Sequence, residues 1–259
     1  MSRPVFVDAV SRLSLPAQPP SLRYSRRIAS ERKHMLSQAA QDYLKSIYKL
    51  QHGHEPRATV NTSMVAERME VAAASATNMI KKLAEMNLVQ HTPYQGVELT
   101  PAGEAVALEV LRHHRLLELY LADALGYDWD EVDAEADRLE HVISEEFEDK
   151  IDRVLGHPTT DPHGAPIPTK DGNIENTDCV PLTQVKPGEA VVIVQVNDQS
   201  PEMLRYLGAL GLRPGVTLFV QEKAPFNGPM TIELDGDTQH VVGVSVSDSI
   251  YVTVTDQST

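Results

Sequence analysis

The chain has 259 residues, of which 41% are hydrophobic, a composition typical of a globular protein with room for two or three small cores. Its formal net charge of −14 disfavours a nucleic-acid partner for the chain as a whole. The charge is unevenly distributed, because residues 1–33 carry seven basic and two acidic side chains and residues 34–100 carry six of each. The acidic excess therefore lies in the C-terminal two thirds, and the N-terminal third can approach a polyanion.

Simple features of the sequence disfavour several classes of protein. No apolar run approaches the roughly 18–20 residues needed to span a bilayer, so we expect no membrane partner. The N-terminus shows neither the continuous apolar segment nor the small-residue cleavage site of a secretory signal. Cys179 is the only cysteine, which rules out an internal disulfide and a cysteine-based zinc cluster. We therefore expect a cytoplasmic protein.

Residues 1–35 are rich in Pro, Ser and Arg and show no sustained periodicity. This composition predicts a flexible basic arm, either with a role in contacting DNA or without one. The alternative is upstream sequence that precedes a true start at Met35.

Three helices and a hairpin are predicted within residues 36–101. The first helix begins near Ser37 and carries apolar residues at i, i+3 and i+4, and two shorter helices follow at about 62–69 and 74–86. Two short strands around a Pro-Tyr-Gln-Gly turn then form a hairpin at 89–100. This order of elements predicts a winged helix-turn-helix DNA-binding domain.

The third of these helices carries a continuous polar arc opposite its apolar face. An asparagine can read adenine through two hydrogen bonds in the major groove, and lysines can contact phosphates or guanine. We therefore predict a DNA-binding surface here, with an arginine before the second helix reaching the flanking backbone. A merely solvated helix face is the alternative. The predicted DNA-binding residues are Ser75, Thr77, Asn78, Lys81, Lys82 and Arg57.

Two longer helices at 102–125 and 131–155 are predicted to form a helical domain over residues 102–156. The first has more apolar surface than one antiparallel neighbour would cover, which indicates either a dimer interface or a monomeric core. A Pro- and Gly-rich linker follows at 157–179. Short β-branched runs then predict a small β-barrel over 180–256, interrupted by one helical segment. The expected fold class is mainly α with a C-terminal small β-barrel.

The second of these longer helices is strongly acidic, and some of its polar residues lie in an unusual place. At about 100° per residue, four of them border the apolar stripe instead of lying opposite to it: Asp133, Asp137, Glu140 and His141. A carboxylate at such a border is partly desolvated, which is costly unless a cation compensates. Because Asp137 and His141 are four residues apart and Glu140 lies beside both, three donors can converge on one ion.

A single helix rarely completes a metal site, and other predicted helices offer further donors. His114 and Glu118 form another i,i+4 pair on the preceding helix, and Asp42 lies on the flank of the first helix. Oxygen-rich ligands with an imidazole and no thiolate suit Mn(II) or Fe(II) better than a soft metal. Spacing alone leaves this metal site and ordinary surface ion pairs as alternatives.

Three sequence blocks resemble the diphtheria-toxin-repressor and manganese-transport-regulator family of metal-dependent transcription factors. They are QDYLKSIYKL at 41–50, the run from VAERMEV to HHRLLELYL at 65–121, and DRLEHVISEE followed by HPTTDPHGAPIP at 137–168. The segment PEMLRYLGALGLRPG also resembles the SH3-like domain that many members append. The resemblance covers about residues 36–254. It implies a homodimer that places two winged helices on a palindromic double-stranded DNA operator.

The resemblance also implies metal ligands by position. A primary site would join the first helix to the dimerisation domain, and a second site would lie nearby, with His114 able to join either. Asp42 and Asp137 are harder ligands than the Met and Cys of iron-responsive members, which favours Mn(II), with Fe(II) as the alternative. Lys45 stands where manganese-type members often have a carboxylate, which disfavours two closely spaced ions. The implied ligands are Asp42, Asp137, Glu140 and His141 for the primary site, and His114, Glu118, Asp133 and Glu202 for the second.

Two other classes of function are compatible with parts of the pattern. A metal-dependent hydrolase could use the Asp/Glu/His cluster, but the chain has no HExxH motif and no dedicated nucleophile. A purely structural dimer could present the same acidic helix to water. The combined pattern favours a manganese-dependent DNA-binding regulator, acting as a repressor of metal uptake and not as an enzyme.

Overall fold

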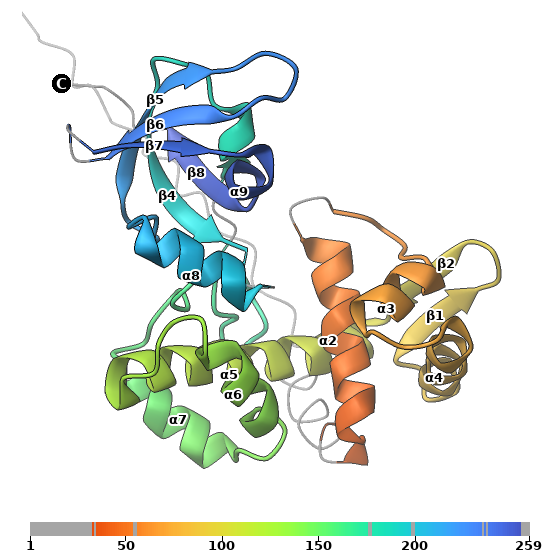
Figure 1. Ribbon diagram of the computed structural model, residues 1–259. Coiled ribbons are helices and arrows are strands. Elements are labelled where there is room, and N and C mark those ends of the chain that lie inside the picture. The colour runs from red at the N-terminus through yellow and green to blue at the C-terminus, as the bar shows by residue number, and fades with distance from the viewer. Residues whose placement is uncertain are drawn as a thin grey trace, which may run out of the picture.

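The computed structural model describes residue 33 and residues 35–53, 56–175, 178–197, 200–234, 236 and 238–254. They form three bodies in chain order, namely a winged helix, a small helical domain and a six-stranded sheet domain (Figure 1). The predicted mainly-α fold with a small β domain at the C-terminus is confirmed. Within these ranges, we find no helix that combines the length and the apolar character of a membrane span.

The winged helix consists of three helices and a hairpin: α2 (Gln38–His52), α3 (Thr62–Arg68), α4 (Ala73–Glu85), β1 (Val89–Thr92) and β2 (Gly96–Leu99). α2 begins at Ser37, whose side chain accepts a hydrogen bond from the Ala40 amide. Gly96 has a φ of +117°, and a Cβ there would lie 2.6 Å from the Val60 carbonyl oxygen. Glycine is therefore required where the hairpin pairs with the chain before α3.

The long helix α5 (Pro101–Leu125) joins two hydrophobic cores. Its first half, with Val106 and Leu111, packs into the core of the winged helix, and its second half, with Leu117 and Leu121, packs into the core of the helical domain. The apolar surface of this helix is thus largely covered within the chain and does not by itself indicate a dimer interface. One rigid element therefore carries both domains (Figure 1).

The prediction of a single acidic helix at 131–155 is wrong, because the structure has two helices there, α6 (Val132–Leu139) and α7 (Glu145–Val154). Ser144 closes the turn between them and caps α7, its side chain accepting a hydrogen bond from the Phe147 amide. The apolar period continues across the break, so periodicity alone predicts one helix. Of the predicted metal-binding residues, Asp133 therefore lies at the start of a short helix, and Asp137, Glu140 and His141 lie at its end and in the turn after it.

The sheet domain is antiparallel, with the strand order β3-β8-β4-β5-β6-β7. Among the described residues, no pairing joins β3 to β7, so the predicted barrel is open on that side. Alternate strand residues such as Val191, Ile193 and Ile232 fill its core. Its elements are β3 (Val180–Pro181), the 3₁₀ turn η1 (Leu182–Gln184), β4 (Ala190–Val196), α8 (Pro201–Ala209), β5 (Thr217–Lys223), β6 (Met230–Leu234), β7 (Thr238–Val242), α9 (Val244–Asp248) and β8 (Ile250–Val254).

The predicted linker packs tightly between the helical domain and the sheet domain. The His163 carbonyl accepts a hydrogen bond from the Val196 amide at 2.9 Å, and a Cβ on Gly164 would lie only 2.0 Å from the Val194 carbonyl oxygen. Trp129, from the loop between α5 and α6, packs into the core of the sheet domain. The sheet domain is therefore docked on the helical domain by buried contacts.

Candidate metal centre

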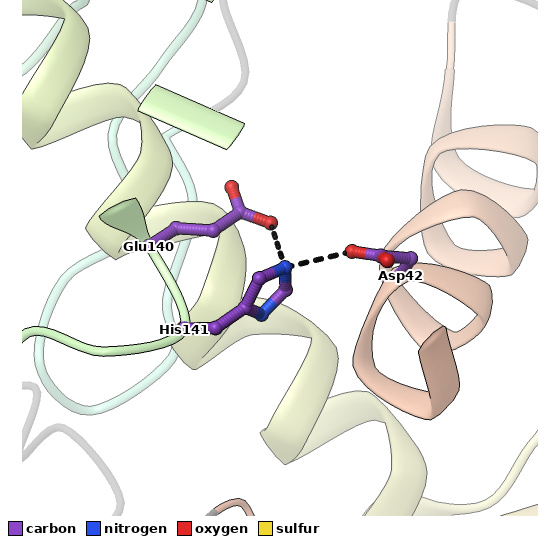
Figure 2. Close-up of side chains that lie close together, drawn as sticks. All are labelled: Asp42, Glu140 and His141. Atoms are coloured by element: carbon purple, nitrogen blue, oxygen red, sulfur yellow. Dashed lines mark ion pairs between the residues drawn. The ribbon is translucent and has the colours of Figure 1, made fainter. Parts of the chain in front are cut away.

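Side chains from α2 and from the end of α6 meet between the winged helix and the helical domain (Figure 2). Asp42 Oδ1 lies 2.9 Å from His141 Nε2, and Glu140 Oε1 lies 3.3 Å from the same nitrogen. The three ligand atoms lie within 4.8 Å of one another, close enough to share one metal ion. A cleft of about 710 Å³ between α2, α3 and α6 opens onto Asp42. These three residues are predicted together from the sequence, and the structure brings them together.

Gln41 determines which nitrogen of His141 faces the two carboxylates. The Gln41 amide nitrogen donates to the Lys33 backbone carbonyl at 3.0 Å, which turns the Gln41 carbonyl oxygen toward His141 Nδ1 at 2.9 Å. Nδ1 therefore carries a proton, and in a neutral imidazole Nε2 presents its lone pair to Asp42 and Glu140. Three acceptor atoms that face one another require a cation between them, which is either a proton or a metal ion.

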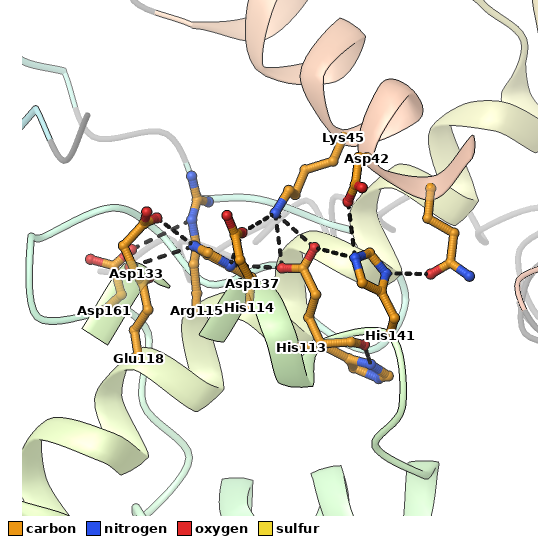
Figure 3. Close-up of polar contacts among 12 residues, drawn as sticks. Asp42, Lys45, His113, His114, Arg115, Glu118, Asp133, Asp137, His141 and Asp161 are labelled. Atoms are coloured by element: carbon orange, nitrogen blue, oxygen red, sulfur yellow. Dashed lines mark hydrogen bonds and ion pairs between the residues drawn. The ribbon is translucent and has the colours of Figure 1, made fainter. Parts of the chain in front are cut away.

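Glu140 is fully buried and is contacted by positive or proton-donating groups of two other helices. Lys45 of α2 places Nζ 2.8 Å from Asp137 Oδ1 (Figure 3). The same nitrogen lies 2.7 and 2.9 Å from the two Glu140 carboxylate oxygens. His114 of α5 places Nδ1 2.7 Å from Glu140 Oε2 and 3.2 Å from Asp137 Oδ1. Asp137 thus shares Lys45 and His114 with Glu140, and no described group of converging ligand atoms joins it to Asp42.

A second group of ligand atoms lies around Glu118 of α5 (Figure 3). His114 Nε2 and His163 Nδ1 each lie 3.5 Å from Glu118 Oε1, and Asp133 Oδ1 lies 3.2 Å from His114 Nε2. Glu118, His163 and Asp161 form a further converging group in which all three side chains are buried. Within the described chain, both Glu118 oxygens and the two imidazole nitrogens are buried without a hydrogen-bond partner. Because such atoms are costly to leave unsatisfied, this donor set fits a metal ion.

Asp161 and His163 are the ligand candidates that sequence reasoning missed. They lie in the segment predicted as a linker, where no helical spacing relates them to Glu118. Asp161 Oδ1 accepts hydrogen bonds from the amides of His163 and Ala165, which closes a tight turn and directs the His163 ring inward. The signal that could have found them is the Asp-Pro-His-Gly run itself, which pairs two ligand types with two turn-forming residues.

Glu202 does not join either group of ligands. Its side chain is 80% exposed at the start of α8 and lies near Ser200 and Arg205. The sheet domain therefore reaches the centre through the connector that carries His163, and Glu202 stays apart from it.

The charges of the centre set the ionisation states of its groups. Burial disfavours the Glu140 carboxylate, but the hydrogen bond from His114 and the charge of Lys45 hold the pKa of Glu140 below its usual value. Burial likewise opposes the charge of Lys45, but Glu140 and Asp137 raise the pKa of Lys45, so its ammonium stays charged. Burial also opposes a charged His163, yet Glu118 raises the pKa of His163 to about 9. A metal ion that binds the His163 imidazole must therefore displace its proton.

Lys33 ties the beginning of the described chain to the same centre. Within the arm predicted at 1–35, the structure describes Lys33 and Met35, and the other residues lie outside the described ranges. The Lys33 side chain is buried, with Nζ 2.5 Å from His113 Nδ1 and 3.3 Å from the Glu140 carbonyl oxygen. Burial lowers the pKa of Lys33, although neighbouring carboxylates favour its charge. This part of the predicted arm is therefore packed.

The predicted DNA-binding residues lie mostly on one exposed arc of α4. Four of them are exposed: Ser75, Asn78, Lys81 and Lys82. Thr77 is partly buried, and its hydroxyl donates to the Ala73 carbonyl of the same helix at 2.8 Å. Arg57 is exposed in the loop before α3, with its guanidinium 3.5 Å from the Met64 sulfur. The arc has the exposure that a helix needs to enter a major groove.

Models of three known domains match the chain in the order of its three bodies. The N-terminal DNA-binding domain of iron-dependent repressors matches residues 35–97, and the metal-binding and dimerisation domain of the same repressors matches residues 100–169. The FeoA domain matches residues 180–254.

Curated relatives and solved structures agree with these matches. The iron-dependent repressor IdeR of Mycobacterium tuberculosis is 32% identical over 206 residues, which cover 75% of this chain and 87% of the relative. The diphtheria toxin repressor of Corynebacterium efficiens is 32% identical over 223 residues, which cover 80% of this chain and 95% of the relative. A solved manganese-dependent transcriptional repressor in complex with manganese is 38% identical, with a TM-score of 0.78, and covers 83% of this chain and 100% of that chain.

The winged helix and the clustered ligands define a metal-dependent DNA-binding regulator. The chain belongs to the diphtheria toxin repressor and IdeR family of metal-dependent transcriptional repressors. Its domains are accordingly those of a repressor that binds DNA, dimerises and responds to a divalent metal ion.

Proposed function

We propose that this protein is a cytoplasmic, homodimeric repressor of metal-uptake genes that binds a palindromic operator when Mn(II) is present. One observation carries the proposal, namely that the ligands of one metal site come from two different domains. Asp42 belongs to the winged helix, whereas Glu140 and His141 belong to the helical domain (Figure 2). A metal ion at this place would couple the position of one domain to the other.

The coupling follows from how α2 is packed. Leu44 and Ile47 of α2 are fully buried in the core that also contains Ile80 and Leu83 of α4. Fixing α2 against the helical domain therefore also fixes α4, which carries the predicted DNA-contacting arc. In a dimer, this would set the spacing between two recognition helices to that of successive major grooves. The bound ion would supply the positive charge that the facing acceptor atoms of Asp42 and His141 require.

The donor set supports Mn(II) as the activating ion, with Fe(II) as the alternative. Two carboxylates and one imidazole are hard or borderline ligands, and they suit Mn(II) and Fe(II) better than softer metals. A solved structure that is 38% identical contains manganese, which supports Mn(II). The curated relatives are named iron-dependent repressors, which keeps Fe(II) as the competing ion.

The group around Glu118 supports a second, accessory ion. Glu118 and His163 would hold it, with His114 and Asp133 or Asp161 as further donors. Since His163 also contacts the sheet domain, an ion here would strengthen the docking of that domain on α5.

Operator binding measured against metal tests the proposal. A fluorescent duplex selected by the protein from random sequences in Mn(II) would be titrated with protein in Mn(II), Fe(II) under anaerobic conditions, Co(II) and Zn(II). We expect Mn(II) at micromolar concentration to raise the affinity at least tenfold, and Asp42→Asn to abolish the rise. Asp123→Asn, an exposed position on α5, is the matched control and should respond like the wild type.

Equal affinity with and without Mn(II) would contradict the metal switch. Full activation by Fe(II) at concentrations where Mn(II) has no effect would replace Mn(II) by Fe(II) and leave the switch intact.

A further inference from the structure

Lys45 occupies an unusual place for a lysine. Its side chain is only 10% exposed, and its ammonium contacts Asp137 (Figure 3). In all, the ammonium lies 2.7 to 2.9 Å from three carboxylate oxygens of Asp137 and Glu140. Burying an ammonium is costly unless anions surround it, and here two carboxylates from another domain do so. The ammonium thus has the environment that a small metal cation would have.

The position of Lys45 coincides with one of the four groups of ligand atoms that converge in the described residues. His114, Asp137 and Glu140 form that group, and the Lys45 ammonium contacts both of its carboxylates. Among the described contacts, Lys45 touches the group of Asp42, Glu140 and His141 only through Glu140, which the two groups share. One candidate cation position is therefore already filled by a side chain of the protein.

Helix geometry explains how α2 supplies both a ligand and a fixed cation. Asp42 and Lys45 are three residues apart, so they project from the same face of α2 toward the end of α6. Glu140 Oε1 lies between them, 3.3 Å from the nitrogen of His141 that Asp42 contacts and 2.7 Å from Lys45 Nζ. Two divalent ions sharing Glu140 would require the second ion to take the place of this ammonium.

We propose that Lys45 is a built-in cation that takes the place of a second metal ion, limits the centre between α2 and Glu140 to one divalent ion, and holds α2 against the helical domain before that ion binds. The proposal rests on the metal site under Proposed function and deepens it. In the metal-free protein, Lys45 joins the two domains through Asp137 and Glu140. The divalent ion then adds a second connection between the two domains, through Asp42 and His141.

The number of bound ions tests the first part of this proposal. Lys45→Glu would replace the ammonium by a carboxylate facing Asp137 and Glu140, and Lys49→Glu makes the same charge change one turn further along α2. Mn(II) per chain would be measured by equilibrium dialysis and metal analysis. We expect Lys45→Glu to bind one ion more than the wild type, with the electron paramagnetic resonance signal of an exchange-coupled Mn(II) pair.

Lys49→Glu should keep the wild-type number of ions and an uncoupled signal. An unchanged number of ions in Lys45→Glu, with wild-type binding intact, would overturn the proposal.

The metal-free protein tests the second part, and it stays informative if Lys45→Glu does not fold. Lys45→Met keeps the length of the side chain and removes its charge, so Asp137 and Glu140 lose their bridge to α2. We expect a lower melting temperature without metal and at least tenfold tighter binding of the first Mn(II), because a repelling positive charge is gone. Unchanged values for both would overturn the proposal.

Failure of the proposed function looks different from failure of the Lys45 proposal. If the wild type bound no Mn(II) between α2 and Glu140, the metal switch would fail in the wild type itself. The role of Lys45 in joining the domains would still be decided by the metal-free melting temperature of Lys45→Met.

Discussion

At the residue scale, Glu148 of α7 is a buried carboxylate outside the metal centre whose ionisation matters for stability. The guanidinium of Arg112 and the imidazole of His113 both contact it, the latter at 3.1 Å. Burial opposes its charge, but the hydrogen bond from His113 and the charge of Arg112 lower the pKa of Glu148 from 4.5 to about 2. A carboxyl with a depressed folded-state pKa stabilises the fold above its unfolded pKa and loses that contribution as the pH falls.

We therefore predict that Glu148→Gln lowers the free energy of unfolding of the metal-free protein by about 3 kcal/mol at pH 7, and by about half as much at pH 3. Urea unfolding from pH 3 to pH 7 measures this difference. Glu146→Gln is the control, because Glu146 is 79% exposed on the same helix and pairs only with Lys150 among the described contacts. A constant difference between Glu148→Gln and wild type over this pH range would refute the assignment.

Gln41 offers a second test at this scale, because it touches no proposed ion. Its carbonyl oxygen holds His141 in the tautomer that directs Nε2 toward Asp42. We predict that Gln41→Ala weakens Mn(II) binding about tenfold to a hundredfold, since such partners orient a ligating imidazole. Gln41→Glu, which keeps an acceptor, should restore most of the affinity. Calorimetric titration of Mn(II) would show the loss, and Gln38→Ala at the exposed start of α2 should show none.

How far the site could be predicted differs from residue to residue. Asp42, Glu140 and His141 could be found because helical spacing and the family blocks both single them out. His163 could not be found by spacing, because its place depends on a turn that folds back onto α5. The family resemblance singles out Lys45, but the burial of its ammonium between Asp137 and Glu140 could not be predicted, since a lysine in a helix normally extends into solvent.

At the element scale, the break between α6 and α7 shows what periodicity conceals. The apolar positions keep their helical spacing across residues 140–144, so the pattern predicts a continuous helix. The local signal was Ser144 followed by Glu145 and Glu146, a serine cap with acidic residues in the first turn. A helix start of this kind overrides an unbroken apolar period.

The exposed arc of α4 leads to a prediction about DNA recognition. Asn78→Ala should cost about 1 to 3 kcal/mol of operator binding and relax the base preference at one position, if Asn78 reads a base directly. Lys81→Ala and Lys82→Ala should each reduce the slope of log affinity against log salt by about one, if each contacts a phosphate. Fluorescence anisotropy in saturating Mn(II) at several salt concentrations provides both quantities.

Lys150→Ala on α7 is the control for the lysine variants, because Lys150 is also exposed but lies outside the winged helix. A salt slope that falls as much in Lys150→Ala as in Lys81→Ala would show that net charge alone explains the effect. Unchanged operator affinity in Asn78→Ala would remove this residue from the interface.

At the scale of the whole molecule, the three bodies and their order could be predicted, whereas their docking could not. Composition marks the segment after α7 as a linker, but the structure packs it against β4 through Gly164 and His163. Trp129 from the helical domain completes the core of the sheet domain. Such contacts depend on residues far apart in sequence, which no local pattern relates.

The close approach at Gly164 gives a prediction about this docking. Gly164 has a φ of +86°, and a Cβ there would lie 2.0 Å from the Val194 carbonyl oxygen. Gly156 has a similar φ of +76° but an open environment, so Gly156→Ala shares the backbone strain without the clash. We predict that Gly164→Ala lowers the free energy of unfolding by at least about 2 kcal/mol more than Gly156→Ala. Urea unfolding would measure it, and equal losses would show that Gly164 can move away from β4.

The central claim is that an ion bound between Asp42 and the Glu140–His141 pair controls DNA binding. Linkage requires the operator to raise the affinity for Mn(II), and the factors for the two ions of the dimer must multiply to the factor by which Mn(II) raises the affinity for the operator. The most direct measurement is therefore the Mn(II) affinity of the dimer with and without operator duplex. We predict at least tenfold tighter Mn(II) binding with DNA in the wild type and no such change in Asp42→Asn. The same Mn(II) affinity with and without DNA in the wild type would contradict the account.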